Sequence, residues 1–382
     1  MQIAKVTNPI TVMKDIVAHR HEYARAWKSR TGGKVLGYFC TYVPEELAYA
    51  AGILPVRILG SHEPQDVTEP YLYSMYCPFS RDCLAQGLKG RYDYVDGIAI
   101  ARTCVHIYQA FDSWQRHLPV SYSYFLAMPS RLTIPSARPL LVEELKRFRV
   151  SLEEWTGKPI SDNALDKAID VYNTNRRLLK KVYDLRKADS PPVLGSEAME
   201  IVLASMLMDK AEHNRLLEDL LAHMPESLLG TMSAGGVRIM IIGMEDDNVE
   251  VLRLVEKTGA NVVIDEHCTG TRYFWGETPP LEDRISALAQ RYLDKPPCPQ
   301  KDVVERRRFD HILKLAEEYR VQGALIVYQK FCDAHQWDIP SLTARLKEHN
   351  IPSLSLEMDV TTPHGQISTR LEAFVEMLQL EV

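Results

Sequence analysis

Short apolar runs alternate with helix-like stretches along the first third of the chain. Four of these runs have the length and composition of buried strands, at 34–39, 55–59, 94–100 and 121–128. Pro44 begins an apolar helical run directly after the first of them. Strands that alternate with helices indicate a parallel sheet covered by helices on its faces. We therefore predict an α/β lobe over residues 1–138.

The pattern changes to helical periodicity in the middle of the chain. Ser161 and Asp162 precede a run in which apolar residues recur every three or four positions, which is typical of a capped amphipathic helix. A second run, from Ser196 to about His223, is rich in methionine, which more often fills a core than binds a cofactor. We predict helices over both runs, within a helical region over residues 139–230.

Strand-like runs return in the last part of the chain, at 237–244, 261–265, 324–328 and 353–358. Helical stretches separate and follow them, at 246–257, 280–293, 302–320 and from Gln366. This alternation predicts a second α/β lobe, over residues 231–382. The whole chain is thus predicted to have an α/β fold with two doubly wound, Rossmann-like lobes, each with a parallel sheet, joined by the helical region.

The composition is that of an ordinary folded protein. Of the 382 residues, 46% are hydrophobic and 25% are charged, which excludes a disordered chain. The 45 basic and 51 acidic side chains give a net charge of −6, which argues against a nucleic-acid or anionic-membrane partner. No apolar run reaches the roughly 18 residues of a membrane span. The first residues lack the pattern of a secretory signal, so we expect a cytoplasmic location.

The seven cysteines do not form a disulfide pattern, because their number is odd and their spacing is irregular. Cys40 and Cys104 follow predicted strands of the first lobe, and Cys268 and Cys332 follow predicted strands of the second. Open α/β sheets bind ligands beyond the carboxyl ends of their strands. Thiols that only fill a core have no reason to prefer those positions. The arrangement therefore favours a metal or cluster held between two lobes.

Spacing also restricts the kind of metal site. Cys77 and Cys298 lie in proline-containing loops, and neither the paired C-x-x-C of structural zinc sites nor the C-x2-C-x2-C of ferredoxins is present. Single thiolates from distant loops remain, which suit an exposed cluster with an open iron site. His106 and His267 lie next to cysteines and are candidate ligands or hydrogen-bond partners of ligands, although ordinary polar packing is more common. Motifs for P-loop, dinucleotide, zinc-protease and serine-hydrolase chemistry are absent.

Long segments of the chain match the pattern of a known family. They are GKVLGYFCTYVPEELAYAAGILPVRILG at 33–60, MYCPFSRDC at 75–83, YVDGIAIARTC at 94–104, CTGTRYFWG at 268–276 and AQRYLDKPPCP at 289–299. Over nearly its whole length the chain resembles the 2-hydroxyacyl-CoA dehydratase and benzoyl-CoA reductase family. The stretches at 60–70 and 85–94 are most similar to the N subunits of Bzd-type, ATP-dependent benzoyl-CoA reductases.

The resemblance implies an iron–sulfur catalytic subunit that works with a homologous second subunit. An ATP-hydrolysing activator with its own [4Fe–4S] cluster would supply low-potential electrons from ferredoxin. The implied reaction is the dearomatisation of benzoyl-CoA to cyclohexa-1,5-diene-1-carbonyl-CoA, in the anaerobic catabolism of aromatic compounds. The family also contains 2-hydroxyacyl-CoA dehydratases, which recycle the electron, and a sister group reduces small molecules at a double-cubane cluster. A subunit that only stores electrons, while its partner binds the acyl-CoA, is a further interpretation.

The same resemblance implies the cluster ligands. Cys77, Cys104 and Cys332 match the three cysteines that hold a [4Fe–4S] cluster in each catalytic subunit, through the motifs C-P-F, R-T-C and K-F-C. Three more cysteines lie in motifs that resemble the double-cubane proteins, whose cofactor is an [8Fe–9S] group, namely Cys40, Cys268 and Cys298. Cys83 matches neither group, and we expect it to be structural.

Ring reduction also requires a general acid. Glu46 and His106 are the candidate catalytic residues, because they lie near the expected ligands in the sequence; Tyr42 and Glu45 lie there too. Carboxylates at the start of a helix are commonly only favourable partners of the helix dipole. The sequence therefore does not choose between these candidates.

Overall fold

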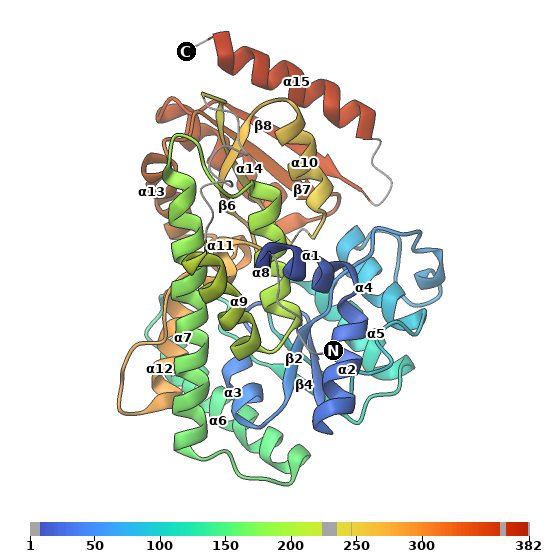
Figure 1. Cartoon of the computed structure of the whole chain (residues 1–382). Helices are drawn as coiled ribbons and strands as arrows, with labels where there is room; N and C mark the ends of the chain where they lie inside the picture. Colours follow the sequence, from blue (N-terminus) through green and yellow to red (C-terminus); the bar gives the residue numbers. More distant parts are fainter. Residues whose placement is uncertain (1–7, 224–234, 246, 360–363, 381–382) are drawn as a thin grey trace.

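Two four-stranded sheets dominate the computed structural model, which describes residues 8–223, 235–245, 247–359 and 364–380 (Figure 1). The first sheet has the order β2-β1-β3-β4, with β1 (Val35–Tyr38), β2 (Leu54–Arg57), β3 (Gly97–Ala101) and β4 (Tyr122–Leu126). The second has the order β6-β5-β7-β8, with β5 (Arg238–Gly243), β6 (Asn261–Glu266), β7 (Gly323–Gln329) and β8 (Ser353–Met358). All paired strands run parallel. The predicted α/β fold with two doubly wound lobes is confirmed.

Both sheets reverse their strand order at their centre. In the first sheet, β1 pairs with β2 on one side and with β3 on the other, so the chain leaves the two central strands in opposite directions. The second sheet repeats this arrangement around β5 and β7. In open α/β sheets the crevice at such a reversal, beyond the carboxyl ends of the central strands, is where ligands bind.

Helices cover the faces of both sheets. The first lobe carries α3 (Glu45–Ala50), α4 (Pro78–Leu88), α5 (Val105–His117) and α6 (Ala137–Thr156), with a 3-10 turn, η1, at Asp66–Thr68. The second lobe carries α10 (Val249–Lys257), α11 (Thr271–Phe274), α13 (Arg307–Glu318), α14 (Asp333–Glu348) and α15 (His364–Leu380), with a 3-10 turn, η4, at Pro299–Lys301. None of the helices in the described parts of the chain is long and apolar enough to cross a membrane.

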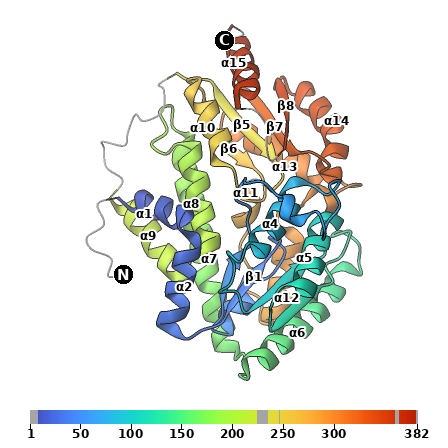
Figure 2. The same cartoon turned by 90° about the vertical axis from the view of Figure 1, so that its right-hand side faces the viewer.

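The middle helices connect the two lobes. They are α7 (Asp162–Asp184), followed by the short η2 (Leu185–Lys187), then α8 (Gly195–Leu207) and α9 (Lys210–Ala222), and the N-terminal α1 (Pro9–Ala18) and α2 (Arg20–Thr31) pack beside them (Figures 1 and 2). α8 is buried on almost every side and contacts both β2 and β6. At Gly195 a Cβ atom would lie 2.5 Å from Cβ of Val262, so only glycine permits this close approach to the second sheet.

One prediction in this region is wrong in detail. The apolar run from Ser196 to about His223 is not continuous, because the chain breaks after Leu207 and starts again as α9. Asp209 causes the restart, since its carboxylate accepts hydrogen bonds from the backbone N–H groups of Ala211 and Glu212 and so caps the new helix. A polar cap between two apolar stretches is easily missed when periodicity alone is counted.

Packing also crosses the predicted domain boundaries. α12 (Arg284–Asp294) follows β5 and β6 of the second lobe in the sequence, yet it packs against α6 and α7 and contributes Leu288 and Tyr292 to the core of the first lobe. This placement carries the loop of Cys298 toward the first sheet. The predicted boundary at residues 230 and 231 lies outside the described residues.

Candidate functional site

The candidate site lies beyond the carboxyl ends of strands of both sheets. Cys40 and Cys104 follow β1 and β3, which are the two strands at the reversal of the first sheet. Cys268 and Cys332 follow β6 and β7 of the second sheet. All four thiols therefore stand at carboxyl ends of parallel strands, at the positions predicted from the sequence. Each is partly exposed to solvent.

Six of the seven thiols influence one another electrostatically. Burial raises the pKa of Cys104 most, and Cys77, Cys332 and Cys298 add to the rise because their negative charges would lie nearby. Burial and the nearby Cys77 likewise raise the pKa of Cys332 to about 12. We call Cys77, Cys104 and Cys332 the first thiol set.

The remaining three thiols form a second group beside the first. Burial raises the pKa of Cys268, and the charges of Cys298 and Cys40 raise it further. We call Cys40, Cys268 and Cys298 the second thiol set. A negative charge on Cys298 would also raise the pKa of Cys104 and Cys332, so Cys298 lies near both thiol sets. The structure thus brings all six cysteines of the sequence prediction into one region between the lobes.

Cys83 lies apart from this region. Its side chain is fully buried in the first lobe, and its thiol donates to the carbonyl oxygen of Ile58 over 3.7 Å. After burial, Asp82 and Asp247 rather than other thiols dominate the rise of its pKa. This environment agrees with a structural role.

Helix N-termini hold the first thiol set. Cys77, Cys104 and Cys332 are the N-cap residues of α4, α5 and α14. The unpaired N–H groups and the dipole at a helix N-terminus favour an anionic thiolate. The backbone N–H groups of Ile107 and His335 accordingly lower the pKa of Cys104 and Cys332, against the larger effect of burial. Three helices of two lobes therefore direct their positive ends at one small volume.

His106 connects the loops of the first thiol set. Its Nδ1 accepts a hydrogen bond of 3.0 Å from the backbone N–H of Cys77, and its Nε2 lies 3.9 Å from the Asp333 carboxylate. Because Nδ1 accepts, the proton of the neutral ring is on Nε2. Burial lowers the pKa of His106, which favours this neutral form. His106 thus orients the Cys77 loop, while His267 bonds to Thr269 instead.

Buried cations surround the second thiol set. They are Arg57 at the end of β2, Arg272 in α11, and Lys295 and Lys301 on either side of Cys298, each at most 3% exposed. Tyr42 also touches this loop, because its hydroxyl accepts a hydrogen bond of 3.1 Å from the N–H of Cys298. Sequence reasoning missed these cations. A signal existed in the symmetrical placement of the two lysines around Cys298.

Glu46 is part of the scaffold behind the second thiol set. It is fully buried, forms an ion pair with Arg176 and accepts a hydrogen bond of 2.9 Å from Tyr292. Burial acts to raise the pKa of Glu46, but Arg176 and Arg291 outweigh it and hold the value at about 2. An ionised carboxylate has no proton to give. The contacts therefore favour a structural role over that of a proton donor.

Glu45 has a different environment from its neighbour. It accepts a hydrogen bond of 3.1 Å from Tyr273, and Lys210 lies 3.8 Å away. Burial lowers the pKa of Lys210 to about 8. This network links α3 of the first lobe to α9 and α11, so it stabilises the junction of the lobes.

Thiols from several loops, with unpaired cationic donors beside them, are donor chemistry that fits an iron–sulfur group. Among the described residues, no group of three or more Cys, His, Asp or Glu side chains is placed to hold one metal ion. Thiolates of a cluster bind different irons and so lie farther apart than ligands of one ion. Nε and Nη1 of Arg57 and Nη1 of Arg272 are buried without a hydrogen-bond partner in the described structure. Such donors match the sulfurs of an anionic cluster.

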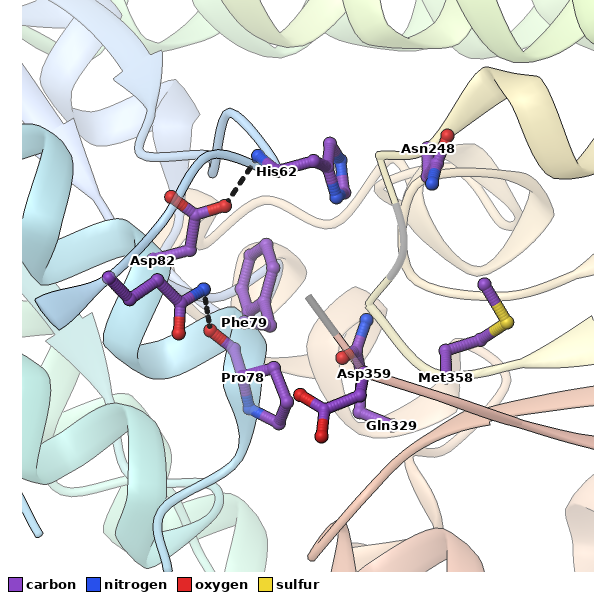
Figure 3. Close-up of a pocket in the computed structure, with 9 residues that line it drawn as sticks. His62, Pro78, Phe79, Asp82, Asn248, Gln329, Met358 and Asp359 are labelled. Carbon is purple, nitrogen blue, oxygen red and sulfur yellow. Dashed lines mark hydrogen bonds between the residues drawn. The ribbon is translucent and has the colours of Figure 1, made fainter. Parts of the chain in front are cut away.

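A small cavity lies beside the first thiol set (Figure 3). His62, Phe79 and Asp82 line it from the first lobe, and Gln329 and Met358 from the second. The Asp82 carboxylate accepts a hydrogen bond of 2.7 Å from the backbone N–H of His62 and fixes this wall. The volume of about 20 Å³ is enough for one water molecule. An acyl-CoA requires far more room, so this cavity is not its binding site in the described arrangement.

Comparison with known proteins identifies the family. A family model described as 2-hydroxyglutaryl-CoA dehydratase, D-component, matches residues 40–378. The chain is 26% identical over 373 residues to the (R)-phenyllactyl-CoA dehydratase beta subunit of Clostridium sporogenes, covering 96% of this chain and 97% of that protein. It is 27% identical over 341 residues to one of the subunits of benzoyl-CoA reductase from Thauera aromatica, covering 87% of this chain and 88% of that protein.

A third relative is the (R)-2-hydroxyglutaryl-CoA dehydratase beta subunit of Acidaminococcus fermentans, 26% identical over 361 residues, which covers 91% of this chain and 93% of that protein. All three relatives are named as single subunits of enzymes. The family match covers most of the chain, including all six cysteines of the two thiol sets. The chain belongs to the 2-hydroxyglutaryl-CoA dehydratase D-component family, and its relatives are subunits of acyl-CoA dehydratases and of a benzoyl-CoA reductase.

Proposed function

We propose that this chain is an iron–sulfur catalytic subunit of an ATP-dependent benzoyl-CoA reductase. The convergence of six thiols from both lobes at the carboxyl ends of the strands carries the proposal. Cys77, Cys104 and Cys332 would hold a [4Fe–4S] cluster. When bound, the cluster supplies single electrons at low potential to the substrate. Benzoyl-CoA is supported by the relative from Thauera aromatica and by the resemblance to Bzd-type N subunits.

The chain's own residues would hold and orient this group. The helix N-termini at the first thiol set stabilise the thiolates, and His106 fixes the Cys77 loop through its hydrogen bond. Reduction of benzoyl-CoA to the cyclohexadiene thioester takes two electrons and two protons. A neutral His106 carries a proton on Nε2 that it can donate, whereas the ionised Glu46 carries none.

The six thiols support the larger cofactor as the second candidate. Three ligands from each set suffice for two cubanes, as in an [8Fe–9S] double-cubane group. Cys298 lies close enough to Cys104 and Cys332 to affect both, so the two sets are adjacent rather than separate sites. A double-cubane reductase of small molecules is the alternative function that this observation favours.

Partners are proposed from the surface near the first thiol set. Exposed large apolar side chains lie within five residues of its cysteines in the sequence, among them Met75, Val105, Phe331 and Trp337. Apolar groups gathered on a surface commonly mark a protein interface. We assign this face to the ATP-hydrolysing activator, fed by ferredoxin, because electrons must enter close to the cluster. A homologous second subunit would complete the acyl-CoA site; the relatives are likewise named as single subunits.

Anaerobic purification with iron and sulfide analysis tests the proposal. About four irons per chain are expected for one cubane and about eight for two. Turnover with benzoyl-CoA, activator and reductant should consume ATP and electrons in proportion to product. A 2-hydroxyacyl-CoA dehydratase would need only catalytic amounts of both. Iron-free protein after anaerobic reconstitution would reject the iron–sulfur function.

A further inference from the structure

Two lysines beside the second thiol set are buried without a carboxylate partner. Lys295 Nζ donates to the carbonyl and hydroxyl oxygens of Thr41, both at 3.2 Å. Lys301 Nζ donates to the carbonyl oxygens of Pro129, at 2.7 Å, and Met128, at 3.4 Å. In the described parts of the chain, no acidic side chain lies within ion-pair distance of either. Their exposed fractions are 2% and 3%.

A buried ammonium group without a counterion is costly, so its pKa falls unless an anion lies beside it. Burial accordingly lowers the pKa of Lys295 to about 7 and that of Lys301 to about 8. The thiols near these ammonium groups belong to the second set: Cys40 lies near both lysines, Cys268 near Lys295 and Cys298 near Lys301, and thiolates that hold a bound group would be anionic. The missing counterion therefore belongs at these thiols.

Two arginines add unpaired N–H donors at the same place. Arg57 forms one ion pair, with Glu245 at 2.8 Å, while its Nε and Nη1 lack a hydrogen-bond partner. Arg272 shares Glu266 with Arg308, and its Nη1 lacks a partner as well. The free donors belong to described residues near Cys40, Cys268 and Cys298.

Among the described residues, the cations near the first thiol set are less buried: Arg81, whose charge lowers the pKa of Cys77 against the larger effect of burial, is partly exposed. Backbone N–H groups, from the helices that its cysteines cap, favour its thiolates. The nearby Lys330 is 44% exposed and lies 3.5 Å from the Asp359 carboxylate, so its charge is paired and solvated. Solvent screens such charges strongly, whereas buried charges act through a low dielectric. The two halves of the site therefore differ in fixed positive charge.

We propose that Lys295 and Lys301, with Arg57 and Arg272, make the second thiol set the half of the site where an added electron resides. An electron adds one negative charge, and the energy of that charge is lowest where buried cations are closest. The inference rests on the iron–sulfur function proposed above in its larger-cofactor form, because it requires an iron–sulfur group on both thiol sets. It adds a direction: electrons enter at the first thiol set, beside the exposed apolar face, and rest at the second.

Redox titration of the anaerobically reconstituted protein tests this inference. Titanium(III) supplies one electron at a time and is oxidised to titanium(IV), and electron paramagnetic resonance follows the reduced signal. Lys295→Met and Lys301→Met should keep full iron and sulfide but shift the midpoint potential to more negative values. Lys330→Met removes a cation near the first set and should leave the potential unchanged.

The outcomes separate the two proposals. Wild-type protein without iron would reject the proposed function, and this inference with it. About four irons per chain, as for one cubane, would keep the proposed function and overturn this inference alone. Full iron with unchanged potentials in both Met variants would overturn the inference alone. If Lys295→Met loses iron, Lys295→Arg distinguishes charge from shape. Recovery of iron and midpoint potential by this charged substitution supports the role proposed for the buried cations. Loss of iron in both Lys295→Met and Lys295→Arg would show that Lys295 matters for its shape rather than its charge, and would overturn the inference.

Discussion

The two thiol sets draw on the two lobes in opposite proportions. The first set takes two cysteines from the first lobe and one from the second, and the second set reverses these numbers. The sheets behind them have the same strand order, so similar loop positions supply the thiols. Neither lobe completes either set alone. The placement of the lobes by α8 and α12 is therefore part of the site.

The sets differ in how they would stabilise negative charge. Helix N-termini serve the first set, and buried ammonium and guanidinium groups serve the second. Backbone dipoles contribute fractional charges, whereas a protonated buried ammonium or guanidinium group carries a whole one. Two sets with equal numbers of thiols would therefore give a bound group different redox properties. Removing parts of each set separately is the direct way to examine this difference.

Replacing a ligand in each set should have the largest effect. Cys104→Ala is expected to abolish activity and to remove the cluster absorbance, while circular dichroism shows an intact fold. Cys268→Ala should lower the iron content by about half if the cofactor is a double cubane, and should leave it unchanged if the first set alone binds iron. Cys83→Ala is the matched control, because that thiol is buried apart from the sets and its loss should lower stability while the iron content stays the same.

The scaffold of the second set gives the next largest expected effect. Glu46→Gln removes the buried partner of Arg176 and should lower the free energy of unfolding by about 3–5 kcal/mol. Tyr292→Phe loses only the 2.9 Å hydrogen bond to Glu46 and should cost about 1 kcal/mol. Denaturant unfolding measures both. Full stability of Glu46→Gln together with lost turnover would instead identify Glu46 as a catalytic group.

The same ion pair predicts a pH dependence of stability. The pKa of Glu46 is about 2 in the folded protein and near 4.5 in the unfolded chain. A folded-state pKa below the unfolded one means that the carboxylate stabilises the fold above pH 4.5 and that this contribution is lost as the pH falls toward 2. Unfolding free energies between these limits should therefore depend less on pH for Glu46→Gln than for wild type. Equal slopes would contradict the lowered pKa.

Sequence patterns predicted the sheets and the strand-exit thiols well, because both depend on local order. Buried strands such as β5 are continuous apolar runs, and Cys104 and Cys332 simply follow them. Long-range packing was not predictable in the same way. The approach of α12 to the first lobe, which brings Lys295 and Lys301 to Cys40, depends on contacts between residues far apart in the sequence, such as Lys295 and Thr41. Such contacts determine which charged side chains surround a site. The sequence patterns therefore did not predict the buried cations around the second thiol set.

Substitutions of His106 test whether its hydrogen bond to the Cys77 loop helps the first thiol set to hold iron. His106→Ala removes the acceptor of the Cys77 N–H, and loss of such a supporting contact typically costs about ten- to a hundredfold in metal affinity. Iron retention during chelator challenge measures this effect. His106→Gln offers a side-chain oxygen as a replacement acceptor and should recover much of the retention. A Gln variant that keeps its iron but loses turnover, with a changed pH profile, would assign His106 to proton transfer instead.

Trp337 should show the smallest effect on the chain itself and a selective effect on its partner. It lies on α14, the helix that Cys332 caps, and its side chain is 81% exposed, so Trp337→Ala should change stability by less than about 0.5 kcal/mol. If the activator docks on this face, its affinity should fall at least about tenfold, or ~1.4 kcal/mol, because exposed aromatic residues often dominate interfaces. Leu380→Ala is the control, since that exposed apolar side chain lies on α15, away from the sets. Equal activator binding by both variants and wild type would place electron entry on another face. The asymmetry between the two sets would then stand, but its direction from the first set to the second would lose its structural basis.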